Sequence, residues 1–354
     1  MISARAYAVA TSSSSFEPFT LSRRDPGPHD VLIDIKFCGI CHSDLHAARD
    51  EWGGQPFPCV PGHEIAGIVA QIGSAVTAYK VGDRVGVGCM VDSCGECDAC
   101  RRGLEMHCEK GVVWTYGSKK FYRDSDPGTH HTFGGYSTAI TVLDRFVVKI
   151  PDALPLDAAA PMLCAGITMY SPLKRYGAGP GKRVGIVGLG GLGHMGVKIA
   201  HAMGAHVTLL TTSPAKAADA RQLGADAVIV STAPAEMKAA ALSLDLIVDT
   251  VSAGHDIDAY MNLLRLEGAL VLVGLSPEKL SIKAGTLTSK RRIFTGSNIG
   301  GIAETQEMLD FCAAHGVASE IELIPATGIN AAYERLQRAD VRYRFVIDSA
   351  TLEQ

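Results

Sequence analysis

The hydrophobic positions in the first 150 or so residues fall into short runs of β-branched residues that glycines interrupt. The clearest runs are 29–40 (HDVLIDIKFCGI) and 64–88 (EIAGIVAQIGSAVTAYKVGDRVGVG), and Gly82 with Asp83 forms a turn signal inside the second. Runs of this kind, bounded by turn residues, are typical of a β-barrel or a β-sandwich. We therefore expect the N-terminal part to be rich in β-strands.

The pattern changes near Pro151, where alanine-rich helical periodicity begins to alternate with short, fully apolar runs. Strands separated by about twenty residues of helical sequence are βαβ units, and such units require a parallel sheet. The middle of the chain is therefore predicted to be a doubly wound parallel sheet. Its predicted strands are 183–188, 206–210, 227–230, 244–250 and 269–274.

The last part of the chain contains one clear helix, AETQEMLDFCAAHG, which Gly316 closes as a C-terminal cap. A chain of 354 residues is long for a single core, so two domains are expected. We expect a two-domain α/β fold with residues 1–152 and 291–354 in the β-rich domain. Residues 153–290 would form an inserted dinucleotide-binding domain.

The charge balance excludes some classes of function. A formal net charge of -4 gives no sign of a surface for nucleic acid or anionic membranes. No apolar run is long enough to span a bilayer, and the N-terminus lacks the order of a secretory signal. We therefore expect a cytoplasmic protein. Several of its ten cysteines are clustered, which indicates metal binding or catalysis rather than disulfides.

A glycine-rich turn follows the predicted strand 183–188. Gly188, Gly190 and Gly193 form the pattern G-x-G-x-x-G between that strand and a helix. In this position the glycines allow a tight turn, close approach of a pyrophosphate and packing of helix on strand, and the helix N-terminus faces the phosphates. The turn predicts dinucleotide binding, with Gly191 and Leu192 also among the contacts.

The end of the next predicted strand indicates which dinucleotide is bound. NAD sites usually carry an acidic residue there, but Thr211, Thr212 and Ser213 occupy this position, with Lys216 one turn later. Ser213 and Lys216 have another interpretation, as a helix cap before Pro214 and a solvated lysine. Because no carboxylate is present to repel a 2′-phosphate, NADP is favoured, and an NAD-dependent enzyme remains the alternative.

A segment with four cysteines, CGECDACRRGLEMHC, predicts a structural zinc site. Cys94, Cys97, Cys100 and Cys108 have a spacing that can wrap a tetrahedral zinc, and four sulfurs close its coordination sphere. An iron–sulfur cluster usually has other spacings.

A second metal site needs residues that lie far apart in the chain. Cys41, His63 and Cys164 would supply two thiolates and one imidazole, which leaves an open fourth position, as in a catalytic zinc site. Spacing by itself does not prove that the three meet, because an isolated histidine such as His63 also occurs as a core residue.

Several segments together resemble the zinc-dependent medium-chain dehydrogenase/reductase superfamily. More narrowly, the chain is similar to the cinnamyl-alcohol-dehydrogenase branch and its bacterial NADP-dependent aldehyde reductases, over nearly its whole length. This resemblance implies a GroES-like β-barrel catalytic domain, a Rossmann domain and an active site in the cleft between them. The segments are CGICHSDLH (38–46), GHEIAGIVAQIGSAV (62–76), the four-cysteine segment, LCAGITMYSPLKR (163–175) and GLGGLGHMGVKIAHAMGA (188–205).

The resemblance also assigns roles to individual residues. It implies that Cys41, His63 and Cys164 bind the catalytic zinc, that Glu64 can approach this metal, and that Asp44 orients the zinc histidine. Ser43 and His46 match the positions of a proton relay. The implied cofactor contacts are Thr168 near the nicotinamide, Thr212, Ser213 and Lys216 at the 2′-phosphate, and Thr250, Val273 and Ser297; the implied pocket residues are Trp52, Met90, Trp114 and Asn298.

The two tryptophans of this pocket have an alternative interpretation as core residues. Segment 118–137 is longer and more charged than the plant-type pattern, so it favours a broad bacterial aldehyde reductase over an enzyme for lignin precursors. The remaining cysteines, Cys38, Cys59, Cys89 and Cys312, are expected to pack in the interior.

The expected function is that of an alcohol dehydrogenase with two Zn²⁺ ions and NADP(H), acting mainly as a reductase of aromatic or medium-chain aldehydes. A non-catalytic NADPH-binding scaffold would have lost a ligand or relay residue, and a zinc-free quinone reductase would lack the four-cysteine segment. Neither loss is seen. The sheet edge around 269–274 and 279–285 could pair with a second copy, so a homodimer is expected.

Overall fold

The computed structural model describes residues 1–123 and 125–353, and the chain forms two compact units. The first unit contains Met1–Cys164 and the chain from Gly300 onward, and the second contains Ala165–Ile299. Both junctions lie later in the chain than residues 152 and 290, where the boundaries were expected. The alanine-rich sequence after Pro151 begins with α3 (Leu156–Ala159) and η3 (Ala160–Leu163), and both pack against strands of the first unit.

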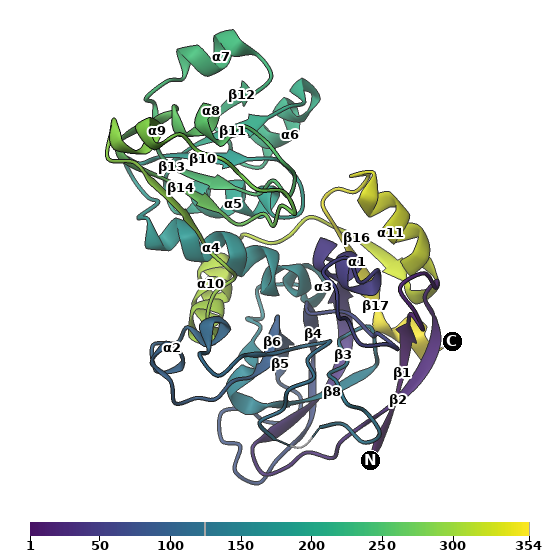
Figure 1. Ribbon diagram of the computed structural model, residues 1–354. Helices are drawn as coiled ribbons and strands as arrows, with labels where there is room; N and C mark the ends of the chain where they lie inside the picture. Colours follow the sequence, from purple (N-terminus) through teal and green to yellow (C-terminus); the bar gives the residue numbers. More distant parts are fainter. Residues whose placement is uncertain (124, 354) are drawn as a thin grey trace. The chain divides into compact units, whose positions relative to one another are not determined.

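A seven-stranded sheet forms the centre of the first unit (Figure 1). Its middle strand β3 (Asp30–Gly39) pairs antiparallel with β4 (Ile65–Ile72), β8 (Ala139–Leu143) and β17 (Arg344–Asp348), and most of its side chains are buried. The predicted run 29–40 is therefore confirmed as a strand, and 64–88 supplies two more. The strand order is β16 (Ile321–Pro325), β17 (Arg344–Asp348), β3 (Asp30–Gly39), β4 (Ile65–Ile72), β5 (Arg84–Val87) and β9 (Val148–Lys149), with β8 (Ala139–Leu143) beside β3.

Shorter elements surround this sheet. The predicted C-terminal helix is confirmed as α10 (Ile302–His315), which is capped by Gly316 in the left-handed conformation with φ 66°. The other elements are β1 (Ile2–Ala8), β2 (Glu17–Arg23), α1 (His42–Ala48), β6 (Met90–Asp92), α2 (Asp98–Arg101), η1 (Glu105–His107), β7 (Val113–Trp114), η2 (Asp144–Phe146), α10 (Ile302–His315), η5 (Ala326–Gly328), α11 (Ile329–Gln337) and η6 (Ser349–Glu353).

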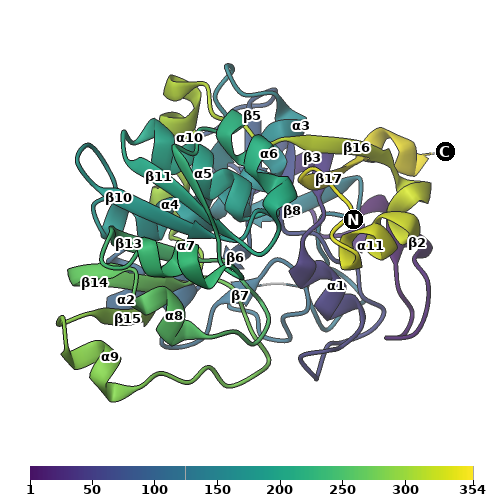
Figure 2. The ribbon, with the colours of Figure 1, turned by 90° about the horizontal axis from the view of Figure 1, so that it is seen from above.

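The second unit is the predicted parallel sheet with helices on both faces (Figures 1 and 2). All six strands are parallel. Their order reverses at β10 (Arg183–Val187), which lies between β11 (His206–Thr211) and β13 (Leu244–Asp249). In such sheets ligands bind beyond the carboxyl ends of the strands at this reversal. The elements are α4 (Ala165–Arg175), β10 (Arg183–Val187), α5 (Gly193–Ala202), β11 (His206–Thr211), η4 (Pro214–Lys216), α6 (Ala217–Gln222), β12 (Ala227–Val230), α7 (Pro234–Ala239), β13 (Leu244–Asp249), α8 (Ile257–Met261), β14 (Leu264–Leu272), α9 (Ala284–Thr288) and β15 (Ile293–Gly296).

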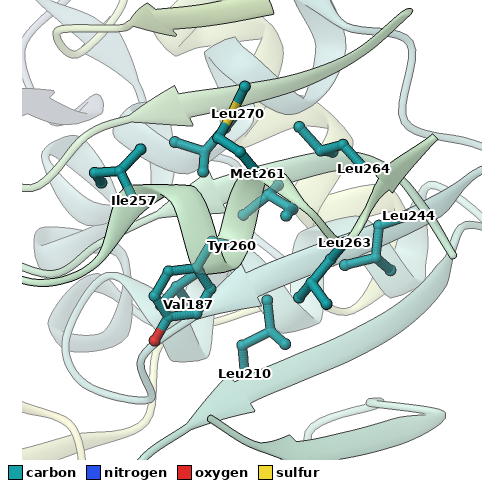
Figure 3. Close-up of a cluster of buried hydrophobic side chains, with 10 residues drawn as sticks. Val187, Leu210, Leu244, Ile257, Tyr260, Met261, Leu263, Leu264 and Leu270 are labelled. Carbon is teal, nitrogen blue, oxygen red and sulfur yellow. The ribbon is translucent and has the colours of Figure 1, made fainter. Parts of the chain in front are cut away.

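A buried cluster fixes α8 on this sheet (Figure 3). Ile257, Tyr260 and Met261 lie three and four residues apart, on one face of the helix, and pack with Val187 and Leu210 from the strands. Each aliphatic side chain buried in this way contributes about 1.5–3 kcal/mol to stability. The cluster therefore fixes both ends of the loop that joins β13 to α8.

The edge of the parallel sheet differs from the prediction. Residues 279–283 form no strand and 284–288 form α9, whereas the edge strand is β15, which pairs in parallel with β14. The alternating polar and apolar residues of 279–283 suggested a strand. They have no ladder to join, because β15 already occupies the hydrogen-bonding edge of β14.

None of the helices in the described part of the chain combines the length and apolar character needed to cross a membrane.

Candidate active site

Four predicted metal ligands meet in the first unit. Cys41, His63, Glu64 and Cys164 are all buried, and one ligand atom from each lies within 4.8 Å of those from the others. The Sγ atoms of Cys41 and Cys164 are 4.0 Å apart. Thiolates bound to one tetrahedral zinc at the usual bond length lie about 3.8 Å apart. The donor set and its spacing therefore fit zinc.

Asp44 holds this cluster together from α1. Its carboxylate is fully buried and accepts hydrogen bonds from Cys41 N at 2.8 Å and Gly62 N at 3.0 Å. His63 Nδ1 lies 3.0 Å from the same carboxylate. With Asp44 as the acceptor of this contact, as it is for the two amides, the proton lies on His63 Nδ1. Its Nε2 is then left for a metal, the arrangement that orients histidine ligands in zinc sites.

The surroundings of the ligands also change their pKa values. The Cys164 thiol, together with the Arg344 guanidinium, holds the pKa of Cys41 well below its usual value, although burial acts in the opposite direction. Burial by itself lowers the pKa of His63, but the Asp44 carboxylate outweighs it and raises the pKa. Cys41 is therefore predisposed to the thiolate form, which is the form that binds metals.

Glu64 is held by only one of its two oxygens. Arg344 Nη2 donates to Glu64 Oε1, and Glu64 Oε2 is buried without a hydrogen-bond partner among the described residues. A side chain at position 39 would place its Cβ 1.9 Å from Oε2, so Gly39 provides the space that this carboxylate occupies. An unpaired buried carboxylate oxygen beside two thiols and an imidazole is a further feature that fits a metal.

The two residues of the predicted proton relay lie on α1. Ser43 and His46 are half-buried and three residues apart, which places them on the same side of the helix. His46 Nδ1 contacts Oε2 of Glu51, an exposed carboxylate. Sequence analysis missed Glu51, because it contacts His46 only after the chain turns back at Asp50, which has a positive φ of 52°.

Three of the four predicted pocket residues lie in the same unit as this cluster. Met90 is buried, but Trp52 is 56% and Trp114 37% exposed, so the interpretation of the tryptophans as core residues is wrong. The Trp52 ring lies 5.2 Å from the His46 ring, and Trp114 pairs with Met90 between β7 and β6. Asn298 is exposed and belongs to the second unit.

The long segment 118–137 makes hydrogen bonds with the backbone of Trp114. Trp114 N donates to Ser118 Oγ at 2.8 Å, and Thr132 Oγ1 donates to the Trp114 carbonyl at 2.9 Å. Lys119 Nζ donates to the carbonyl of Gly54, two residues after Trp52. Asp124 in this segment lies outside the described residues. The segment therefore connects the backbones that carry both tryptophans.

The four-cysteine segment folds into a second cluster. The sulfurs of Cys94, Cys97, Cys100 and Cys108 all lie within 4.8 Å of one another. Those of Cys94 and Cys100 are 3.8 Å apart, the edge of a zinc–thiolate tetrahedron. Cys97 N also lies 3.4 Å from Cys94 Sγ, a contact that stabilises a thiolate. This set fits a structural zinc with a closed coordination sphere.

In the second unit the glycine-rich turn follows β10 and opens α5. Gly188 has φ +88°, and a Cβ at Gly193 would lie 2.0 Å from the Gly188 carbonyl, so both positions require glycine. A Cβ at Gly190 would meet nothing within 4 Å, so this side of the turn is open. Gly191 and Leu192 complete the turn, and Leu192 is the residue before α5. The turn leaves room for a pyrophosphate at the start of the helix.

The residues predicted at the 2′-phosphate lie at the end of β11 and in η4. Ser213 is the N-cap residue of η4, but its side chain makes no capping hydrogen bond. Thr212 is exposed. Lys216 Nζ donates to the carbonyl of Leu189 in the glycine-rich turn at 2.9 Å. The interpretation of Lys216 as a solvated lysine is therefore wrong.

The remaining predicted cofactor residues all belong to the second unit. Thr168 is buried on α4. Thr250, Val273 and Ser297 follow the ends of β13, β14 and β15, and each donates its amide to the end of a neighbouring strand. They therefore share the edge of the sheet at which the glycine-rich turn lies.

The other cysteines divide into two groups. Cys38, Cys59 and Cys312 are buried, as predicted, and burial raises the pKa of Cys59 to about 12. Cys89 is only half-buried, and the adjacent Cys164 thiol lowers its pKa. Cys59 therefore remains a neutral thiol at physiological pH.

Two family models match the chain. The alcohol dehydrogenase GroES-like domain matches residues 27–152, and the zinc-binding dehydrogenase model matches residues 191–314. They confirm the predicted combination of a GroES-like domain and a Rossmann domain.

Close relatives cover nearly the whole chain. It is 55% identical to "NADP-dependent alcohol dehydrogenase C 1" of Mycolicibacterium smegmatis over 99% of both chains. It is 52% identical to "Aldehyde reductase YahK" of Escherichia coli, over 98% of this chain and 99% of the relative. Among solved structures, a cinnamyl alcohol dehydrogenase from Sorghum bicolor superposes with a TM-score of 0.94 at 46% identity, over 99% of this chain and 98% of the other.

Proposed function

The chain belongs to the zinc-binding alcohol dehydrogenase family, as its motifs predicted, and we propose that it reduces aldehydes reversibly with NADPH and zinc. The observation that carries this proposal is the cluster of Cys41, His63 and Cys164, in which Asp44 fixes the tautomer of the histidine. Two thiolates and one imidazole leave one coordination position for water or substrate. A structural site would be closed, as the four-cysteine cluster is.

Zinc held by these residues supplies a Lewis acid that polarises a carbonyl group, and NADPH supplies the hydride. The chain itself must hold the ligands and bring a proton to the product oxygen. Asp44 keeps the proton of His63 on Nδ1, so the imidazole binds as a neutral ligand. Glu64, paired with Arg344, adds a carboxylate beside the ligands.

We place the proton path on α1. The Ser43 hydroxyl can pass a proton by rotation, and His46 can take it up on one ring nitrogen and release it on the other. The contact of His46 with the exposed Glu51 connects this path to solvent. This contact supports Glu51 as a third member of the proposed relay.

The residues that follow β11 favour NADP over NAD as the cofactor. No carboxylate occupies the end of this strand, and Thr212, Ser213 and Lys216 offer two hydroxyls and an ammonium. The Ser213 side chain makes no hydrogen bond that caps η4. A 2′-phosphate therefore meets donors without a competing negative charge.

We propose the substrate class from the apolar side chains predicted to line the pocket, one of which, Trp52, lies beside His46. Met90, Trp52 and Trp114 favour aromatic or medium-chain aldehydes. Exposed indole rings beside a polar relay are typical of a site that takes up apolar ligands.

We further propose a cytoplasmic homodimer. Strand β15 ends the parallel sheet at an edge whose Ile293 is 43% exposed, and an uncovered edge of this kind can pair with a second copy.

The proposal is tested by initial rates of benzaldehyde and cinnamaldehyde reduction by zinc-replete protein, with NADPH and NADH in parallel. We expect turnover, a strong preference for NADPH, and loss of turnover in Cys41→Ser. Preference for NADH would overturn the phosphate site and leave the chemistry intact. Absence of turnover across a panel of aldehydes with both cofactors would overturn the enzymatic proposal in favour of a binding scaffold.

A further inference from the structure

A buried carboxylate lies at the end of β13, next to the glycine-rich turn. Asp249 is fully buried, and its Oδ2 lies 2.6 Å from Nε2 of His255. Its other oxygen accepts a hydrogen bond from Val251 N at 3.0 Å. A buried carboxylate is costly unless it is paired, so His255 is the partner that makes this position tolerable.

The second nitrogen of His255 shows that this pair holds an extra proton. His255 Nδ1 lies 2.8 Å from the carbonyl oxygen of Ala253, which can only accept a hydrogen bond. Nδ1 must therefore carry a proton, and one more proton lies between Nε2 and Asp249. Burial raises the pKa of Asp249, which favours retention of this proton. Whichever atom holds it, the pair as a whole is neutral.

The position of the pair connects it to the dinucleotide site. Asp249 stands opposite Val187 in the register of β13 and β10, and the residue after Val187 is Gly188. Neighbouring strands lie about 5 Å apart, so the carboxylate is close to the turn that receives the pyrophosphate. The backbone carbonyl of Asp249 also accepts from Val273 N and Gly274 N at 2.9 and 3.1 Å.

The loop between Asp249 and His255 has little freedom to compensate for a lost partner. Its far end is anchored by Ile257 and Tyr260 in the cluster of Figure 3, and the His255 ring packs edge-on against Tyr260 at 5.6 Å. At its near end Thr250 Oγ1 donates to the Val187 carbonyl at 2.6 Å. Loss of His255 would therefore leave the Asp249 carboxyl group in the same place without its partner.

From these contacts we infer that His255 is a positioning residue for cofactor binding: it neutralises Asp249 beside the glycine-rich turn, so that an anionic dinucleotide can bind there. The inference rests on the proposed function for its ligand, NADP(H). It assigns His255 no contact with the reacting atoms and no part in proton transfer to the substrate.

The test is a set of NADPH titrations, followed by fluorescence, on zinc-replete full-length protein. In His255→Gln the carboxylate keeps a donor but loses the neutralising proton, and we expect NADPH to bind roughly tenfold more weakly. In Asp249→Asn the charge is absent, and the affinity should stay close to that of the wild type. The double variant Asp249→Asn/His255→Gln should recover most of the lost affinity.

This recovery separates the electrostatic role from a merely structural one. If the double variant binds as weakly as His255→Gln, or if His255→Gln binds like the wild type, the inference is overturned. Glu278→Gln is the matched control, because Glu278 approaches Gly254 in the same loop but is exposed, and its loss should not change the affinity.

The folding of the variants and their steady-state kinetics distinguish failure of this inference from failure of the proposed function. If His255→Gln fails to fold, Asp249→Asn should restore both folding and NADPH binding, and a double variant that still fails to fold contradicts the inference. If the wild type itself does not bind NADPH, the proposed function fails. If the wild type binds NADPH and all variants bind it with the same affinity, only the role of His255 is contradicted.

Steady-state turnover gives an independent measurement. His255→Gln should raise the KM for NADPH and leave kcat nearly unchanged.

Discussion

The ammonium group of Lys216 donates a hydrogen bond to the carbonyl oxygen of Leu189, so a side chain from η4 reaches the glycine-rich turn. The two residues are 27 positions apart in the chain. The contact places the positive charge of Lys216 next to the turn expected to bind the pyrophosphate. We propose that the 2′-phosphate binds between Lys216 and Ser213.

Replacement of Lys216 by alanine is expected to change cofactor selectivity. A charge-assisted hydrogen bond contributes about 1.5–3 kcal/mol, so the KM for NADPH should rise roughly tenfold or more. The KM for NADH should change little, since NADH lacks the 2′-phosphate. Steady-state kinetics with both cofactors measure this, and Lys238→Ala on the exposed side of α7 is the control. An equal loss for both cofactors would place Lys216 at the pyrophosphate instead.

Replacement of His46 by glutamine is expected to slow proton delivery. Glutamine keeps a polar side chain on α1 but cannot exchange a proton, and general acid–base groups contribute about 10²–10⁴-fold to rates. We expect kcat for benzaldehyde reduction to fall within this range, with partial recovery in imidazole buffer. His315→Gln, at the exposed end of α10, is the control. A large loss without recovery in imidazole would argue against the relay.

Replacement of Asp44 by asparagine is expected to weaken zinc retention in the first unit. The NH₂ group of the new amide would replace one carboxylate oxygen. It would then face either Cys41 N, at the Oδ2 position, or Gly62 N and His63 Nδ1, at the Oδ1 position. Partners of metal ligands typically contribute 10–100-fold to affinity, so release of one zinc to a chelator should be faster by roughly that factor. The second zinc, in the four-cysteine cluster, serves as the internal reference. Unchanged release of both ions would contradict the role of Asp44.

Stability at acidic pH is expected to depend on Asp30. Burial raises the pKa of this carboxyl group, but the Arg24 guanidinium and the Gly27 amide outweigh burial and hold it below its usual value of 3.8. A lowered pKa means that the stabilisation is complete above about pH 4 and is lost as the pH falls through the folded-state pKa. Asp30→Asn should therefore lower the free energy of unfolding at pH 7 by about 1–3 kcal/mol.

This difference should shrink below pH 4, as the wild-type carboxyl group becomes protonated. Denaturant unfolding at pH 7 and pH 3.5 measures it, and Asp25→Asn, on an exposed side chain, is the control. A difference that is the same at both pH values would show that the ionisation of Asp30 is not its cause.

The chain by itself determined those features whose parts are close together in sequence. The four thiols of 94–108 need only a short loop to surround one ion, so their spacing is nearly sufficient. The strand, glycine-rich turn and helix around Gly188 form one continuous segment, and short-range sterics decide its conformation. The alternation of apolar runs with helical periodicity predicted the parallel sheet for the same reason.

Only the tertiary structure decided which distant groups meet. Cys41 and Cys164 are 123 residues apart, and Glu64 and Arg344 are 280 apart, so their contacts depend on how the whole first unit packs. The edge strand was misplaced because 279–283 has the right alternation, but β15 occupies the same edge of β14. The pairs His46–Glu51 and Asp249–His255 are local in sequence, yet their side chains meet only through turns that spacing does not reveal. Local patterns follow from short-range sterics and burial, whereas these contacts follow from long-range packing, which no single segment encodes.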